Sequence, residues 1–205
     1  MTKENEIDPN SLPEVSDGSK RQLAQELKIA KFWQQCDFLP KLFRENPANC
    51  LVAIKLAELT GMEVLAVTQS LSQVNGKWRF DGKFCTALVN NSKRFKGNLR
   101  FRYSGTLENK DRSCTAWAVE ADTGEILECT VDSDMVRRFG WESQGLKMWV
   151  KMPDQMFAYR AASMFVDRYA PELKMGMGTV EDEIDIQSAQ NVEVRVTSSD
   201  GEVRE

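Results

Sequence analysis

Hydrophobic residues follow a helical spacing in the first part of the chain and a different spacing from about residue 63 onward. In the first part, apolar side chains recur three and four positions apart, and Gly61 follows as a stop signal. Asn75-Gly76 is a strong signal for a hairpin turn, because both residues tolerate a left-handed backbone. These patterns predict, in order, helices over 19–38 and 47–60, a hairpin of 64–74 with 77–80, and a short helix over 83–92.

Three later segments carry the pattern of β-strands. In 99–103 apolar residues alternate with arginines, so one face of this strand is predicted to be buried and the other basic. Residues 113–120 and 126–131 are the next strand candidates, and a turn over 122–125 joins them. Together they predict a three-stranded antiparallel meander, which needs a helix over its apolar face to be stable.

The helix expected to cover the meander is 154–169. It is apolar on most sides, which indicates a buried helix, because a surface helix shows a single apolar stripe. Its narrow polar stripe consists of Arg160, Ser163 and Asp167, spaced three and four apart. The predicted fold class is therefore α+β: a three-stranded antiparallel β-meander plus a β-hairpin, packed on a long central helix, with N-terminal helices.

Charge is distributed unevenly along the chain, whose net formal charge is −4. Residues 1–17 carry one lysine against five acids, and 181–205 carry two arginines against eight acids, which leaves 18–180 with a net charge of +6. The ends also lack hydrophobic periodicity. We therefore predict a disordered acidic N-terminus over 1–18, one folded domain over 19–180 and a flexible acidic tail over 181–205.

The chain contains no histidine. This excludes Ser-His-Asp and Cys-His catalysis as well as histidine-ligated metal sites. A phosphate-binding loop of the form GxxxxGK[ST] is absent, and no GxGxxG opens a helix, so the common nucleotide sites are excluded too. We therefore expect a binding protein that is not an enzyme and has neither a metal nor a cofactor.

The five cysteines are widely spread and form no CxxC pair. This spacing predicts small buried side chains in a reducing compartment and gives no support to a zinc or redox centre. No apolar run approaches the roughly 18 residues that span a bilayer, and the N-terminus lacks the apolar segment of a secretory signal. A cytoplasmic protein without membrane contact is expected.

Segment 76–102 carries the strongest signal for a ligand. It holds eight cations against the single acid Asp81, with aromatic residues interleaved. Cations neutralise backbone phosphates and aromatic faces stack on bases, so this composition predicts contact with nucleic acid. The predicted base-stacking residues are Trp78 and Phe95. The predicted phosphate contacts are Lys77, Arg79, Lys83, Lys93, Arg94, Lys96, Arg100 and Arg102.

A second group of cations brackets the start of the buried helix. Lys147 and Lys151 precede the helix, and Arg160 lies within it. We rank these three as additional DNA contacts. For Arg160 the alternative is an ion pair with an acid inside the fold.

Two other interpretations of this composition stay open. A solvated basic face that meets an acidic partner protein would carry the same residues. A metal-dependent nuclease would use the acids near 120–134 or 181–185, because carboxylate oxygens suit hard divalent ions. No pair of these acids lies in an identifiable apolar segment, so the nuclease has the weaker support.

The most specific pattern in the chain is an ordered series: Trp149, Pro153, Met156, Arg160-Ala161, Ser163, Arg168, Pro171, Gly176 and Glu181. In this order the chain resembles the RecT family of phage single-strand DNA annealing proteins (recombinases). Two earlier segments are also similar to the family: 53–62, a helix that ends in Gly-Met, and Gly76-Lys77 with Ala87-Leu88-Val89. The likeness covers about residues 45–183.

The resemblance implies ATP-independent annealing of complementary single strands in homologous recombination by an oligomeric ring or filament. It also implies a β-β-β-α core and makes 19–180 the single-strand annealing domain. The implied partners are single-stranded DNA, the annealed duplex, further copies of the chain and a partner exonuclease, with Mg²⁺ only as a companion of the DNA. The chain departs from the family in its short acidic end after residue 183, which puts a folded partner-binding module in doubt.

Overall fold

The computed structural model describes residues 17–143 and 148–183. Contacts divide these residues into two compact units. The first unit contains 17–58 and 63–69, and the second contains 59–62 and 70–183. Within the described ranges, no helix combines the length and apolarity that crossing a bilayer requires.

The first unit is helical. Its small core includes Ala30, Phe43, Cys50 and Val67. The predicted N-terminal helices are confirmed, and the described structure starts two residues before the predicted domain boundary at 19. The helices are α1 (Asp17–Gln34), α2 (Lys41–Arg44), α3 (Pro47–Thr60) and α4 (Val64–Ser70).

Helix α4 corrects the first strand of the predicted hairpin. The β-forming residues from position 64 are helical as far as Ser70, and the strand is confined to β1 (Leu71–Val74). Val67 and Thr68 are buried within α4, so tertiary packing overrides the local β-propensity there.

The hairpin turn itself is confirmed. Strand β1 pairs antiparallel with β2 (Lys77–Phe80). Asn75 and Gly76 join the strands with φ of +51° and +74°, as a tight two-residue turn requires. The short helix that follows is α5 (Gly82–Asn91).

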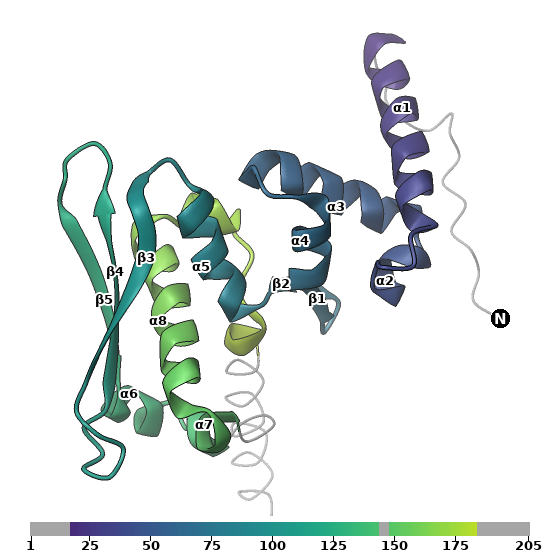
Figure 1. Cartoon of the computed structure of the whole chain (residues 1–205). Coiled ribbons are helices and arrows are strands. Elements are labelled where there is room, and N and C mark those ends of the chain that lie inside the picture. The colour runs from purple at the N-terminus through teal and green to yellow at the C-terminus, as the bar shows by residue number, and fades with distance from the viewer. Residues whose placement is uncertain (1–16, 144–147, 184–205) are drawn as a thin grey trace, which may run out of the picture. The chain divides into compact units, whose positions relative to one another are not determined.

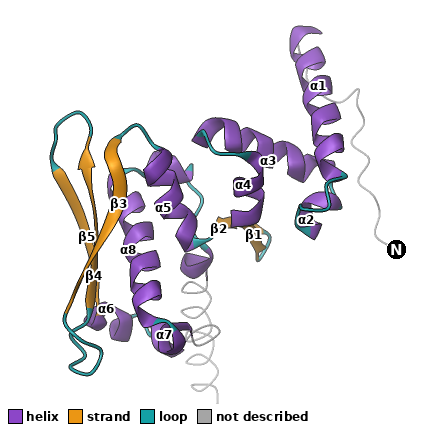
Figure 2. Ribbon diagram, viewed as in Figure 1, coloured by secondary structure: helices purple, strands orange, loops and turns teal. Residues whose placement is uncertain are grey.

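The meander is also confirmed. Its strands are β3 (Phe95–Ser104), β4 (Ser113–Glu120) and β5 (Ile126–Asp132), in the order β3-β4-β5. Figures 1 and 2 show α5 and α8 (Pro153–Tyr169) against one face of this sheet. The remaining elements are α6 (Ser133–Arg138), η2 (Trp141–Ser143), α7 (Met148–Lys151) and η3 (Pro171–Lys174).

One face of the meander and one side of α8 form the main core of the second unit. Val131 from the sheet and Phe157, Ala161 and Phe165 from α8 are all buried in it. The α+β class is thereby confirmed. The expectation of one long helix at the centre of the whole fold is not confirmed, because α8 packs within the second unit and α1, with 18 residues, is longer.

Two turn glycines provide a matched test of this sheet. Gly105, after β3, and Gly124, before β5, have φ of +67° and +74°. Alanine in this conformation costs about 1–2 kcal/mol at either position. A Cβ at position 105 would also collide with the backbone carbonyl oxygen of Asp111, whereas position 124 has open space.

We therefore expect Gly124→Ala to lower the free energy of unfolding by about 1 kcal/mol. Gly105→Ala should lower it by about 1–3 kcal/mol more, because the backbone must move. Urea unfolding followed by circular dichroism measures both values. Equal losses in the two variants would contradict the close contact at Gly105.

Candidate nucleic-acid interface

A row of three cations lies along the edge strand β3. The side chains of Lys96, Arg100 and Arg102 are exposed, whereas Leu99 is buried and Phe101 packs against the core. This alternation is the one predicted for the strand, so its basic face points away from α8. In Figure 2 none of the described helices of this unit lies on that side of the sheet.

Cross-strand neighbours complete this open face. Arg100 lies opposite Trp117 of β4, and Trp117 lies opposite Glu128 of β5. The Arg100 guanidinium is 5.8 Å from the centre of the Trp117 ring. Arg102 forms an ion pair with Glu128 at 2.9 Å, with both side chains largely exposed, so solvent weakens this pair. Among the described residues Lys96 forms no ion pair.

Other predicted cations are bound to acids elsewhere in the unit. On β2, the Arg79 guanidinium lies 2.6 Å from the Glu183 carboxylate, and the Lys77 amino group lies 3.8 Å from it. Lys83, at the start of α5, pairs with Asp81 at 3.2 Å. The hairpin lies on the other side of the α5 and α8 layer from the sheet, as Figure 1 shows. The predicted cations of β2 and β3 therefore lie on opposite sides of this helix layer.

The turn before β3 carries two more of the predicted contacts. Lys93 is exposed there. Arg94 bridges two acids, with its guanidinium 2.8 Å from Glu172 and 3.6 Å from Glu120. Lys93 can extend the basic row beyond Lys96, whereas Arg94 is largely neutralised by its acidic partners.

Of the three additional DNA contacts predicted around the start of α8, the two that the structure describes also lie in different environments. Lys151 is exposed at the end of α7. Lys147 lies outside the described residues. Arg160 is only 5% exposed, and its guanidinium lies 3.4 Å from Asp182. Arg160 therefore forms an ion pair inside the fold, as the alternative interpretation predicted.

The two predicted stacking residues occupy different environments. Phe95 is 5% exposed and its ring packs against Phe165, with centroids 5.5 Å apart, so it is a core residue and is withdrawn as a stacking candidate. Trp78 is half-buried on the hairpin, opposite Gln73. Trp117 was not among the predicted stacking residues. It lies on the same sheet face as Arg100, and the alternation of inward and outward positions in 113–120 could have identified it.

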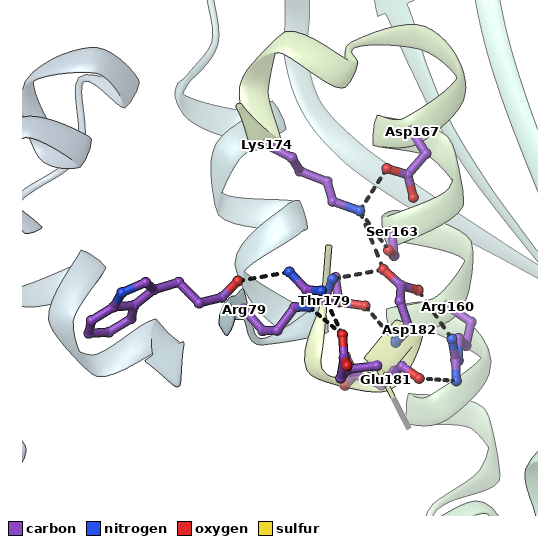
Figure 3. A network of polar contacts seen from close by, with 10 residues as sticks. Arg79, Arg160, Ser163, Asp167, Lys174, Thr179, Glu181 and Asp182 are labelled. Carbon is purple, nitrogen blue, oxygen red and sulfur yellow. Dashed lines mark hydrogen bonds and ion pairs between the residues drawn. The ribbon is translucent and has the colours of Figure 1, made fainter. Parts of the chain in front are cut away.

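Residues 174–183 form a polar network with the stripe of α8, shown in Figure 3. The buried Lys174 amino group lies 2.7 Å from Asp167, 3.3 Å from Ser163 and 3.7 Å from Asp182. The sequence pattern identified the stripe as polar but not Lys174 and Asp182 as its partners. A buried charge needs such partners, because an unpaired one is strongly destabilising.

The same segment binds the hairpin. The Phe80 amide donates to the carbonyl of Gly178, and Phe80 forms a parallel bridge with Thr179. Arg79 donates from Nε and Nη2 to one carboxylate oxygen of Glu183, at 3.1 and 2.6 Å. The described structure thus continues past the predicted start of the tail at 181. Within it, Asp182 and Glu183 bind cations of α8, η3 and the hairpin.

Two neighbouring acids in this segment have opposite electrostatic environments. The hydrogen bond from Arg79 lowers the pKa of Glu183. Burial raises the pKa of Glu181, and its Oε2 atom is buried without a hydrogen-bond partner among the described residues. Relative to a free glutamate, the fold thus stabilises the ionised form of Glu183 and disfavours the ionised form of Glu181.

The described residues were also compared with the requirements of a metal site and of a reactive thiol. The described residues contain no group of three His, Cys, Asp or Glu side chains arranged to hold a metal ion. Four of the five cysteines are buried and all are free thiols, as the spacing predicted. Burial raises the pKa of Cys85 to about 12 and that of Cys114 to about 11, which makes both thiols poor nucleophiles.

Comparisons with models of protein families, with curated proteins and with solved structures find no match for this chain. The resemblance to the RecT family therefore stays a prediction.

Replacing Glu183 by glutamine should destabilise the protein near neutral pH. The Glu183→Gln change leaves the partly buried Arg79 guanidinium without its carboxylate, so the unfolding midpoint at pH 7 should fall below that of the wild type. A lowered pKa contributes stability above the ordinary glutamate value, and this stability is lost as the pH falls through the lowered value. The difference should therefore shrink below about pH 4.

Glu181→Gln is the matched control and should have the opposite effect. A raised pKa means that the wild type loses stability as the pH rises through the raised value, because a buried carboxylate must ionise. The glutamine variant should unfold at a higher temperature than the wild type at pH 8 and at a similar temperature at about pH 4. Thermal unfolding at several pH values measures both variants, and a shift in the same direction for both at pH 8 would contradict these assignments.

Proposed function

We propose that this protein binds single-stranded DNA and anneals complementary strands without ATP, as an oligomer, in homologous recombination of the phage type. The observation that carries the proposal is the row of Lys96, Arg100 and Arg102 on a sheet face that none of the described helices of its unit covers. The resemblance of residues 149–181 to the RecT family points to the same activity.

The chemistry of this face suits a single strand. Guanidinium and ammonium groups bind phosphates regardless of sequence, so they provide affinity without base readout. Alternate residues of a strand lie roughly 7 Å apart, which places the Arg100 and Arg102 side chains side by side along β3. A sugar-phosphate backbone held along this edge leaves the hydrogen-bonding edges of its bases free to pair.

Oligomer formation follows from the small number of contacts. The β3 row offers three exposed cations, or four with Lys93, and the chain has a net charge of −4. So few phosphate contacts give weak and salt-sensitive binding by one protomer. Linking many protomers turns later contacts into intramolecular ones and raises the overall affinity by orders of magnitude. The proposal needs no catalytic residue and no cofactor, and Mg²⁺ enters only with the DNA.

An annealing assay tests the activity directly. Two complementary labelled oligonucleotides mixed with the protein in Mg²⁺, without ATP, should form duplex faster than the oligonucleotides alone, and both should keep their full length. Shortened products would instead support the nuclease. Equally tight binding to poly-glutamate and to DNA, without annealing, would support the acidic partner protein and contradict the proposal.

Removing the basic row should weaken DNA binding in a predictable way. The triple variant Lys96→Gln, Arg100→Gln and Arg102→Gln loses three phosphate contacts. We expect the slope of log K against log salt concentration to become shallower by about 2, with at least about tenfold weaker binding at low salt. Fluorescence anisotropy of a labelled oligothymidylate at several salt concentrations gives both quantities.

A charge-matched variant controls for the change in net charge. Lys20, Lys28 and Lys31 are exposed on α1, and their replacement by glutamine removes the same charge from the first unit. This variant should keep the wild-type slope. If both triple variants lose the same slope, binding follows net charge and the β3 row is not the site.

A further inference from the structure

Trp117 occupies an unusual position for a large aromatic residue. It lies at an outward-facing position of β4, the middle strand, and is half-buried. Within the described residues, Trp141 and Trp149 belong to the hydrophobic core, whereas Trp117 lies outside that cluster. Its indole therefore lies outside the main core, and the exposed part of this large side chain is available to a ligand.

The charges on either side of Trp117 are different. On β3 the outward residues are the cations Lys96, Arg100 and Arg102. On β5 the outward residue opposite Trp117 is Glu128, and Ile126 is exposed beside it. The outward cations are therefore on β3, where an anionic backbone is attracted, and a phosphate at Arg102 would replace its exposed partner Glu128. Neighbouring strands lie about 4.8 Å apart, so a group attached to a backbone on β3 reaches over β4.

We propose that Trp117 is a stacking site for one unpaired nucleobase of a strand whose phosphates bind Lys96, Arg100 and Arg102. This inference rests on the proposed function and specifies the ligand as an unpaired, base-bearing strand. Stacking uses the face of the base and leaves its pairing edge free, and it tolerates every sequence because each base has such a face.

Arg100 is placed to form part of the same site. Its guanidinium lies 5.8 Å from the indole centre, near the outer limit of a cation–π contact. A contact at this distance is weak and is readily exchanged for a phosphate. Arg100 thus holds the backbone beside the ring while the attached base covers the indole.

The test compares a strand with bases and a strand without them. Trp117→Leu should weaken binding to oligothymidylate about 5- to 140-fold, which corresponds to about 1–3 kcal/mol for one stacked base. Its affinity for an abasic oligonucleotide of the same length should equal that of the wild type, because the phosphate contacts are intact. Trp117→Phe should retain most of the affinity for oligothymidylate.

Tryptophan fluorescence reports the contact itself. Oligothymidylate should quench part of the wild-type emission, and this quenching should vanish in Trp117→Phe but persist in Trp33→Phe, which alters a tryptophan of α1 in the first unit. The conservative Phe variants keep an aromatic side chain, so this measurement decides the matter even if Trp117→Leu does not fold.

Three results would overturn the proposal. Unchanged oligothymidylate affinity in Trp117→Leu, together with lost binding in the β3 triple variant, would reject stacking and leave the proposed function intact. Equal losses for the abasic and base-bearing strands would show a structural role for Trp117. A wild-type protein that binds neither strand would reject the proposed function and this site together.

Discussion

The second unit depends on the requirement that a buried charge be paired. Helix α8 presents an apolar side to the sheet and a stripe of Arg160, Ser163 and Asp167 on another side. Lys174 and Asp182 supply the opposite charges and are held within a few ångströms of that stripe. Removing one partner of such a group leaves an uncompensated charge in a poorly solvated place, which costs far more than a surface ion pair contributes. The segment after η3 is therefore bound to α8 by electrostatics as well as by packing.

This arrangement decides which cations are available to a ligand. The same segment extends to Glu183, which binds Arg79 and so draws the hairpin into the network. The partly buried Arg79 is therefore needed by the fold, whereas Arg100 and Arg102 on β3 have an aromatic ring or an exposed acid beside them. Helices α5 and α8 cover one face of the sheet, and none of the described helices of the unit covers the basic face of β3. The cations of the polar network and the cations of β3 thus lie on opposite sides of the helix layer.

Local patterns predicted the elements of the fold well, because each depends on short-range physics. The Asn75-Gly76 turn needs only its own backbone conformation, and the alternation in 99–103 needs only a strand with one buried face. The errors arose where distant residues decide the outcome. Packing of Val67 makes a helix of residues that favour strands, and Phe95 is taken into the core by Phe165. Pairing between segments about a hundred residues apart, as for Arg79 and Glu183, leaves no mark on either local sequence.

Weak binding by each protomer suits an annealing protein better than tight binding would. A strand held by many strong contacts could not exchange its protein partners for a complementary strand. Solvent-exposed cations and a single partly exposed indole offer individually small contributions, each of which can be released as a base pair forms. In the proposed oligomer, neighbouring protomers would keep the strand bound while any one of them releases it, because the remaining contacts are intramolecular. In the proposed complex the outward cations lie on β3 and Glu128 lies on β5, so a strand bound along β3 would direct its bases across β4 and leave one side open to its complement.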